Sequence, residues 1–197
     1  PTGTAGEDIV APMIEVAWMR KLADAIQRPV TFAMLQVDTA PELWREMLDE
    51  SAAALASGAP LYPQVAGRPT GLLSGFDTTF SFIDGVPAYQ ALAGRPVPEK
   101  IAYLRTAEGR AAVVDWEPDP DTAAQLVHAA ERTYLLGDPP DYEPGPEATL
   151  AAVAARSGRS VVEVALDAML ADDGTGLLYL PILNYSDRNS DSTREMI

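Results

Sequence analysis

Cysteine is absent from this sequence, and histidine occurs only once, as His128. Without thiols the chain can form no disulfide, no cysteine nucleophile and no thiolate metal site, a composition that fits a reducing compartment such as the cytoplasm. A single imidazole provides neither a catalytic triad nor the imidazole ligands that usually hold a catalytic zinc ion. We therefore predict no metal site formed by this chain alone.

Long hydrophobic runs and positive charge are also scarce. No segment has the roughly 18 successive apolar residues that a membrane-spanning helix needs, and the first residues, Pro-Thr-Gly-Thr, do not lead from a basic segment into an apolar one as a signal peptide would. The formal net charge is −15 and the basic residues are scattered, which disfavours binding to a phosphate backbone. We expect a cytoplasmic protein that binds neither nucleic acid nor membrane.

Hydrophobic residues make up 47% of the chain, an ordinary share for a globular protein. Apolar residues at helical spacing predict helices over about 12–27, 43–55, 147–156 and 160–170. Short apolar runs predict strands over 30–35, 60–66 and 177–183. Strands that are apolar on both faces are typical of a parallel sheet covered by helices, so the pattern predicts an α/β fold.

Local signals place the ends of several helices. Thr39 with Glu42, and Ser160 with Glu163, have the spacing of capping boxes that open helices. Glycines at 58 and 158 follow two of the predicted helices and are expected to end them. The segment 67–85 is apolar but interrupted by glycine and proline, so we expect a packed loop over a sheet edge.

Three parts of the chain are predicted from this pattern. Residues 1–86 form strand and helix units, residues 87–146 form a mainly helical insertion, and residues 147–197 form a further helix and strand unit in which the last helix is cut short. Buried parallel strands need neighbours at their edges. We therefore expect further sequence, or another chain, to cover the sheet edges.

Polar residues follow each predicted strand. Gln36 follows the first strand, Gln64 and Arg68 lie at or beyond the end of the second, and Asn184 and Asp187 follow the third. In parallel α/β folds the carboxyl ends of the strands form the ligand site, so these five residues are the predicted substrate-binding residues. The alternative, that they are ordinary cap and loop residues, remains open.

The order of several segments resembles a known family. These segments are RPVTFAMLQ, APLYPQVAGRPTGLLSGFDTTFSFIDGVPAY, LLGDPPDYEP and LLYLPILNYSD. Together they resemble the middle and later part of the D-aminoacylase branch of the amidohydrolase superfamily, whose members are also called N-acyl-D-amino-acid deacylases. The resemblance implies a (β/α)₈ TIM barrel, of which this chain would supply about strands five to seven with their helices and an insertion.

The resemblance also implies a chemistry. Members of the family hydrolyse an amide C–N bond with one or two zinc ions that activate water. Zinc would belong to the full-length parent, and no cofactor is expected in this chain alone. Met34 and Tyr62 stand near the positions where the family commonly has ligand histidines, and neither is a usual zinc ligand. Either the metal site is altered, or this alignment is shifted, or catalysis has been lost.

Two functions follow as hypotheses. The first is a fragment of an amidohydrolase-like hydrolase whose parent cleaves the amide bond of N-acyl amino acids, including the D-forms, or of related small amides. The second is a non-catalytic relative that acts as a binding or scaffold protein.

Overall fold

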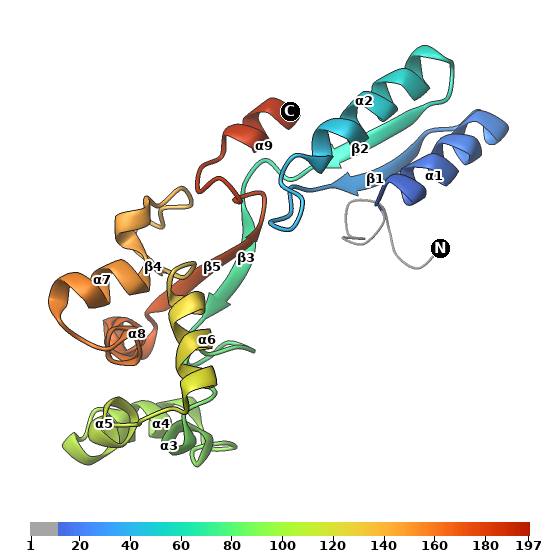
Figure 1. Ribbon diagram of the computed structural model, residues 1–197. Coiled ribbons are helices and arrows are strands. Elements are labelled where there is room, and N and C mark those ends of the chain that lie inside the picture. The colour runs from blue at the N-terminus through green and yellow to red at the C-terminus, as the bar shows by residue number, and fades with distance from the viewer. Residues whose placement is uncertain (1–11) are drawn as a thin grey trace. The chain divides into compact units, whose positions relative to one another are not determined.

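The computed structural model describes residues 12–197, which form two compact units (Figure 1). One, called here the outer unit, contains the chain up to Thr70 together with Ile182–Ile197. The other, the inserted unit, contains Gly71–Pro181 and so interrupts the outer unit in sequence. The first residues, for which we expected no signal peptide, lie outside the described residues.

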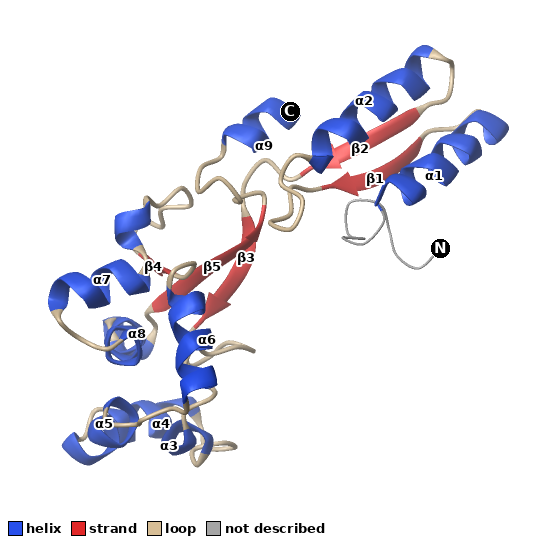
Figure 2. Cartoon of the chain, in the orientation of Figure 1, coloured by secondary structure: helices blue, strands red, loops and turns tan. Residues whose placement is uncertain are grey.

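The outer unit is a pair of parallel strands packed against helices. Its elements are α1 (Pro12–Ile26), β1 (Val30–Met34), α2 (Leu43–Ala56), β2 (Leu61–Val65) and α9 (Asp191–Met196). Strands β1 and β2 pair in parallel, with Val30 opposite Leu61 and Met34 opposite Val65 (Figure 2). Helix α2 provides the crossover that a parallel pair requires.

Alternation along β1 positions the core of this unit. Phe32 and Met34 are buried, whereas Thr31 between Val30 and Phe32 is exposed. The buried strand residues pack against one face of α1 and one face of α2 because both helices place apolar side chains at helical spacing. The buried members of this core are Val16, Met19, Ala23, Phe32, Met34, Trp44, Met47, Ala54, Ala59, Leu61 and Met196.

The opposite face of this small sheet is open. Thr31 and Tyr62 are register partners, and both are exposed, as is Gln64 on the same face. Parallel sheets are usually covered on both faces, and each strand of a two-stranded sheet has one edge without a partner strand. Among the described residues, nothing pairs with the outer edges of β1 and β2.

The inserted unit is mainly helical around a three-stranded sheet. Its elements are β3 (Thr70–Ser74), α3 (Pro87–Gln90), α4 (Val97–Leu104), α5 (Ala107–Val114), α6 (Pro120–Ala130), β4 (Tyr134–Leu136), α7 (Leu150–Ser157), α8 (Val161–Leu170) and β5 (Leu177–Leu183), with 3₁₀ turns η1 (Pro146–Ala148) and η2 (Asp172–Gly174). The sheet order is β3-β5-β4. Strands β4 and β5 are antiparallel, with Tyr134 opposite Tyr179.

The expectation of a TIM-barrel segment is wrong. Only β1 and β2 have the predicted parallel arrangement, and β5 belongs to a different sheet, in which its partner β4 is antiparallel. The error has a physical cause: Leu178 and Tyr179 are consecutive and both buried, and such a run suits an antiparallel strand enclosed in a helical core as well as a parallel one.

Strand β3 corrects a second expectation. It lies within the segment 67–85, which we expected to be a loop, and it was hidden from the pattern by Gly71. A Cβ at Gly71 would collide with the carbonyl oxygen of Leu180. Glycine is therefore required where β3 approaches β5.

The capping predictions have mixed outcomes. Ser160 caps α8 as expected, because its hydroxyl accepts from the Glu163 amide at 3.1 Å. The capping box at Thr39 does not form, since Glu42 is the N-cap of α2 and makes no side-chain cap. Gly158 ends α7 in the left-handed region, at φ 66°, as predicted.

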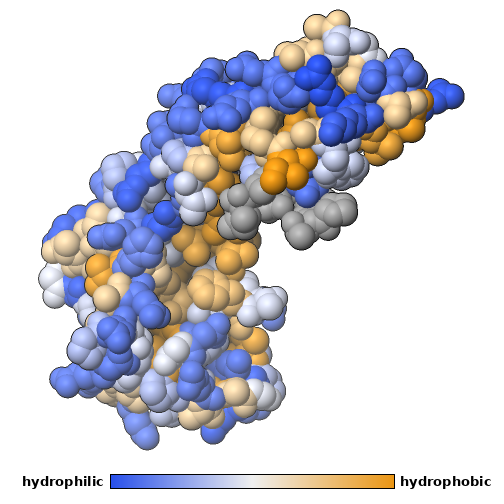
Figure 3. All heavy atoms as spheres, turned by 45° about the vertical axis from the view of Figure 1, so that its right-hand side comes forward, coloured by the Kyte–Doolittle hydropathy of each residue, from blue (hydrophilic) through white to orange (hydrophobic). Residues whose placement is uncertain are grey.

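Apolar side chains also reach the surface of the outer unit. Ile14, Trp18, Leu22 and Ile26 recur every four residues on one flank of α1, and each is at least 38% exposed. Apolar residues lie among hydrophilic ones on the face drawn in Figure 3.

No helix within residues 12–197 has both the length and the apolar character that a membrane crossing demands.

Candidate functional site

A buried polar network forms where β1 and β5 end, all within the outer unit. The backbone amide of Gln36 donates to Asn184 Oδ1 at 2.8 Å, and the backbone amide of Asn184 donates to the Gln36 carbonyl at 3.0 Å. Both residues are fully buried. Two of the predicted site residues, 148 positions apart, are therefore in direct contact.

The side chain of Gln36 extends this network. Its Nε2 donates to Asp187 Oδ2 at 2.8 Å and to Ser192 Oγ at 3.0 Å, and its Oε1 accepts from the Ser186 amide at 3.2 Å. Ser192 also donates to Asp187 Oδ2 at 3.0 Å. A buried amide with this many partners is held in one orientation.

Asn184 can begin the turn after β5 because of its backbone conformation. Its φ is 60°, in the left-handed region that asparagine adopts more readily than most residues. This turn aims Oδ1 at Gln36 and brings Asp187 back toward the end of β1.

Asp187 is the exposed member of the network. Both of its side-chain hydrogen bonds use Oδ2, so Oδ1 accepts no hydrogen bond from any residue in 12–197. A carboxylate oxygen that is fixed in place and open to solvent can accept an N–H from a bound molecule. The network therefore has a rigid buried side and one available acceptor.

Gln64 and Arg68 lie elsewhere in the outer unit. Gln64 is exposed on the open face of β2, and its side chain makes no hydrogen bond within the described part of the chain. Arg68 is exposed, and its Nη1 lies 3.4 Å from the Pro69 carbonyl oxygen. Near them, the Ala66 carbonyl accepts from Asn184 Nδ2 at 3.5 Å, which links the end of β2 to the network.

Sequence reasoning did not identify two members of the network, Ser186 and Ser192. No periodic pattern marks them, because Ser192 meets Gln36 across 156 residues. The hydroxyl groups of Ser186 and Thr193 are buried and have no hydrogen-bond partner among the described residues. Buried polar groups are nearly always paired, so these two hydroxyls are positions in this region where a further hydrogen bond can form.

Helix α9, which carries Ser192, is fixed to α2 by Arg45. The guanidinium donates to Glu195, and its Nε donates to Glu42 at 2.7 Å. It also lies 4.1 Å from the centroid of the Trp44 ring. The hydrogen bond from Arg45 holds the pKa of the exposed Glu195 below its usual value.

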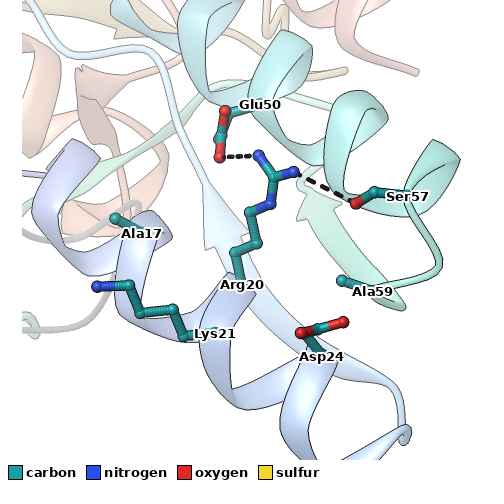
Figure 4. A pocket seen from close by; sticks show the side chains of 7 residues that line it. All are labelled: Ala17, Arg20, Lys21, Asp24, Glu50, Ser57 and Ala59. Atoms are coloured by element: carbon teal, nitrogen blue, oxygen red, sulfur yellow. Dashed lines mark hydrogen bonds and ion pairs between the residues drawn. The ribbon is translucent and has the colours of Figure 1, made fainter.

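A groove of about 410 Å³ lies between α1 and α2 (Figure 4). Arg20 reaches across it, with Nη1 2.6 Å from Glu50 Oε1 and Nη2 3.2 Å from Ser57 Oγ. The guanidinium thus joins the two helices instead of presenting a free cation. Lys21 and Asp24 also line the groove and are exposed.

The residues present do not fit the zinc ion that the family resemblance implies. No group of three or more His, Cys, Asp or Glu residues within 12–197 is placed to hold a metal ion. Met34 is fully buried in the core of the outer unit, and Tyr62 is a partly exposed phenol on the open sheet face. His128 is exposed on α6 of the inserted unit.

The polar network around Gln36 offers hydrogen-bonding groups to a polar molecule. Within residues 12–197 it includes neither a nucleophile paired with a general base nor a group of metal ligands. Comparisons of the chain with protein-family models, with curated proteins and with solved structures found no match.

Proposed function

We propose that this chain provides the substrate-binding part of a cytoplasmic hydrolase that cleaves the amide C–N bond of an N-acyl amino acid or a related small amide. The observation that carries the proposal is the pair of hydrogen bonds by which Gln36, just beyond β1, holds both Asn184 and Asp187. The resemblance to the D-aminoacylase branch supplies the substrate class, and the lack of cysteine agrees with the location.

Asp187 would orient the substrate. The residue is exposed and its Oδ1 accepts no hydrogen bond within residues 12–197, and an amide N–H is a suitable donor to a fixed carboxylate. The carboxylate of an acylated amino acid would be repelled by Asp187 and needs a cation instead. Arg68, two residues beyond the Ala66 carbonyl that meets Asn184, is the candidate for a bidentate contact with that carboxylate.

The groups that break the bond would come from outside residues 12–197. Both outer edges of the β1–β2 sheet lack a partner strand among these residues, and one sheet face is exposed. We propose that another chain or further sequence covers these edges and supplies the catalytic residues. The buried hydroxyls of Ser186 and Thr193 support such a partner, because each lacks a hydrogen bond among the described residues.

A titration with a panel of N-acetyl amino acids, followed by amide NMR spectra of the full chain, tests this proposal. We expect saturable binding that Asp187→Asn weakens about tenfold, the effect of losing one charge-assisted hydrogen bond. Arg68→Gln should weaken binding of the acids but not of their neutral amides. Asp77→Asn, an exposed change in the inserted unit, is the matched control.

Binding that is unchanged in Asp187→Asn, or no saturable binding at all, would exclude this site.

A second function, a non-catalytic binding protein, is favoured by the lack of a metal-ligand group among residues 12–197. The two are separated by assaying acetate release with and without added zinc and a candidate partner. Binding without turnover under every condition favours the non-catalytic protein.

A further inference from the structure

The inserted unit contains a cavity that the proposed function does not use. Its volume is about 290 Å³, near the lower end of the range for small-molecule sites. It lies between the loop after β3 and helices α3 and α4. Its lining includes Phe76, Ser81, Asp84, Tyr89, Gln90 and Lys100.

Two aromatic rings form a fixed apolar wall. Phe76 and Tyr89 are both buried, and their ring centroids are 6.2 Å apart with the planes tilted by 41°. Burial raises the pKa of the Tyr89 phenol, against a smaller opposing effect of its hydrogen bond with Ser81. The ring is therefore neutral at physiological pH.

One positive and one negative side chain line the same cavity without pairing. The ammonium of Lys100 lies 5.4 Å from the centroid of the Tyr89 ring, and it forms no ion pair with any residue in 12–197. Asp84 accepts from the Ser81 amide through Oδ2 at 2.8 Å, which leaves Oδ1 available. Charges of opposite sign that line one cavity but do not neutralise each other can bind the two charges of a zwitterion.

We propose that this cavity binds a free α-amino acid with an apolar or aromatic side chain. Lys100 would bind its carboxylate, Asp84 would bind its ammonium group, and the side chain would pack on Phe76 and Tyr89. An N-acyl amino acid lacks the ammonium group, and an amino-acid amide lacks the carboxylate. The site thus selects a different molecule from the one bound at Asp187.

The test is a titration of the full chain with L- and D-phenylalanine and L-leucine, observed by amide NMR and by calorimetry. N-acetylphenylalanine, phenylalaninamide and glycine each lack one recognised group, so each should bind at least about tenfold more weakly. Lys100→Gln and Asp84→Asn should raise the Kd for phenylalanine by a similar factor. Lys100→Arg, which keeps the charge, should stay within about threefold, and Lys21→Gln in the outer unit should have no effect.

Several results would overturn the proposal. These are no saturable binding of any free amino acid up to tens of millimolar, equal affinity for phenylalanine and its two blocked forms, or unchanged affinity in a folded Lys100→Gln variant. The comparison of phenylalanine with its blocked forms uses the unmodified chain. It therefore tests the proposal even if a variant fails to fold. Asp187→Asn should leave phenylalanine binding unchanged, which separates this site from the proposed substrate site.

Discussion

Gln36 and Asn184 are joined by two hydrogen bonds of opposite direction. The Asn184 amide donates to the Gln36 carbonyl at 3.0 Å, and the Gln36 amide donates to the Asn184 side chain at 2.8 Å. This contact joins the turn after β5 to the segment after β1. In the sequence, the whole inserted unit lies between these two positions. The outer unit is therefore completed only when the last sixteen residues, 182–197, return to it.

Replacing Gln36 by alanine should destabilise the protein by about 2–4 kcal/mol, because several buried partners would lose their hydrogen bonds. Chemical denaturation with urea measures the change. Gln64→Ala is the control, since the Gln64 side chain is exposed and makes no hydrogen bond within residues 12–197. This substitution should alter the free energy of unfolding by no more than about 0.5 kcal/mol. Equal effects of the two substitutions would contradict the network.

Ser160→Ala should cost about 1 kcal/mol, the usual effect of losing an N-cap side chain. Thr39→Ala should have little effect, because the capping box expected there does not form. Thermal unfolding of both variants, read by circular dichroism, compares them directly. A larger loss of stability in Thr39→Ala than in Ser160→Ala would show that the assignment of the two caps is reversed.

Asp167 on α8 should make stability depend on pH. Partial burial would raise the pKa of Asp167, but hydrogen bonds and charge from Arg110 and Arg159 outweigh it and hold this pKa below its ordinary value. The stabilisation is therefore present above the unfolded pKa of about 3.9 and is lost as pH falls through the lower, folded value.

Asp167→Asn should accordingly lower the free energy of unfolding by no more than about 1 kcal/mol at pH 7, because water screens a carboxylate that is 40% exposed. The difference between this variant and the unmodified chain should shrink toward pH 2. Urea unfolding at pH 7 and at low pH measures it, with Asp77→Asn as control. A difference that grows on acidification would contradict this ion-pair network.

Zinc should bind this chain no more tightly than about micromolar, the range of casual surface contacts, and no N-acetyl amino acid should be hydrolysed by the chain alone. The reason is the donor set: one histidine and no cysteine. Calorimetric titration with zinc, beside an assay for acetate release, tests both statements. A stoichiometric site of higher affinity, or turnover that a chelator abolishes, would contradict both statements.

Local structure was largely predictable from the sequence, whereas the pairing of distant strands was not. The helix over Pro12–Ile26 and the cap at Ser160 follow from side chains within a few positions of one another. The parallel pairing of β1 with β2 was also predicted, because a helix connects two adjacent apolar runs.

Strand β5 pairs with β3, which contains Gly71, and with β4, a strand of three residues flanked by a helix and a proline-rich turn. Such a strand leaves no periodic signal of its own. In the candidate site, too, local features were predictable and contacts between distant residues were not. Placing Gln36, Asn184 and Asp187 at strand ends identified residues that meet, but Ser192 was not identifiable because only the folded chain brings it to Gln36.

The close approach of Gly71 to Leu180 and Pro181 has a further consequence. The inserted unit enters and leaves through two neighbouring positions on adjacent strands. A module whose two ends touch can be excised, grafted into another host, or replaced by a short turn with little strain on its surroundings. We therefore expect that residues 71–181 can be exchanged as a unit while the remainder of the chain keeps its fold.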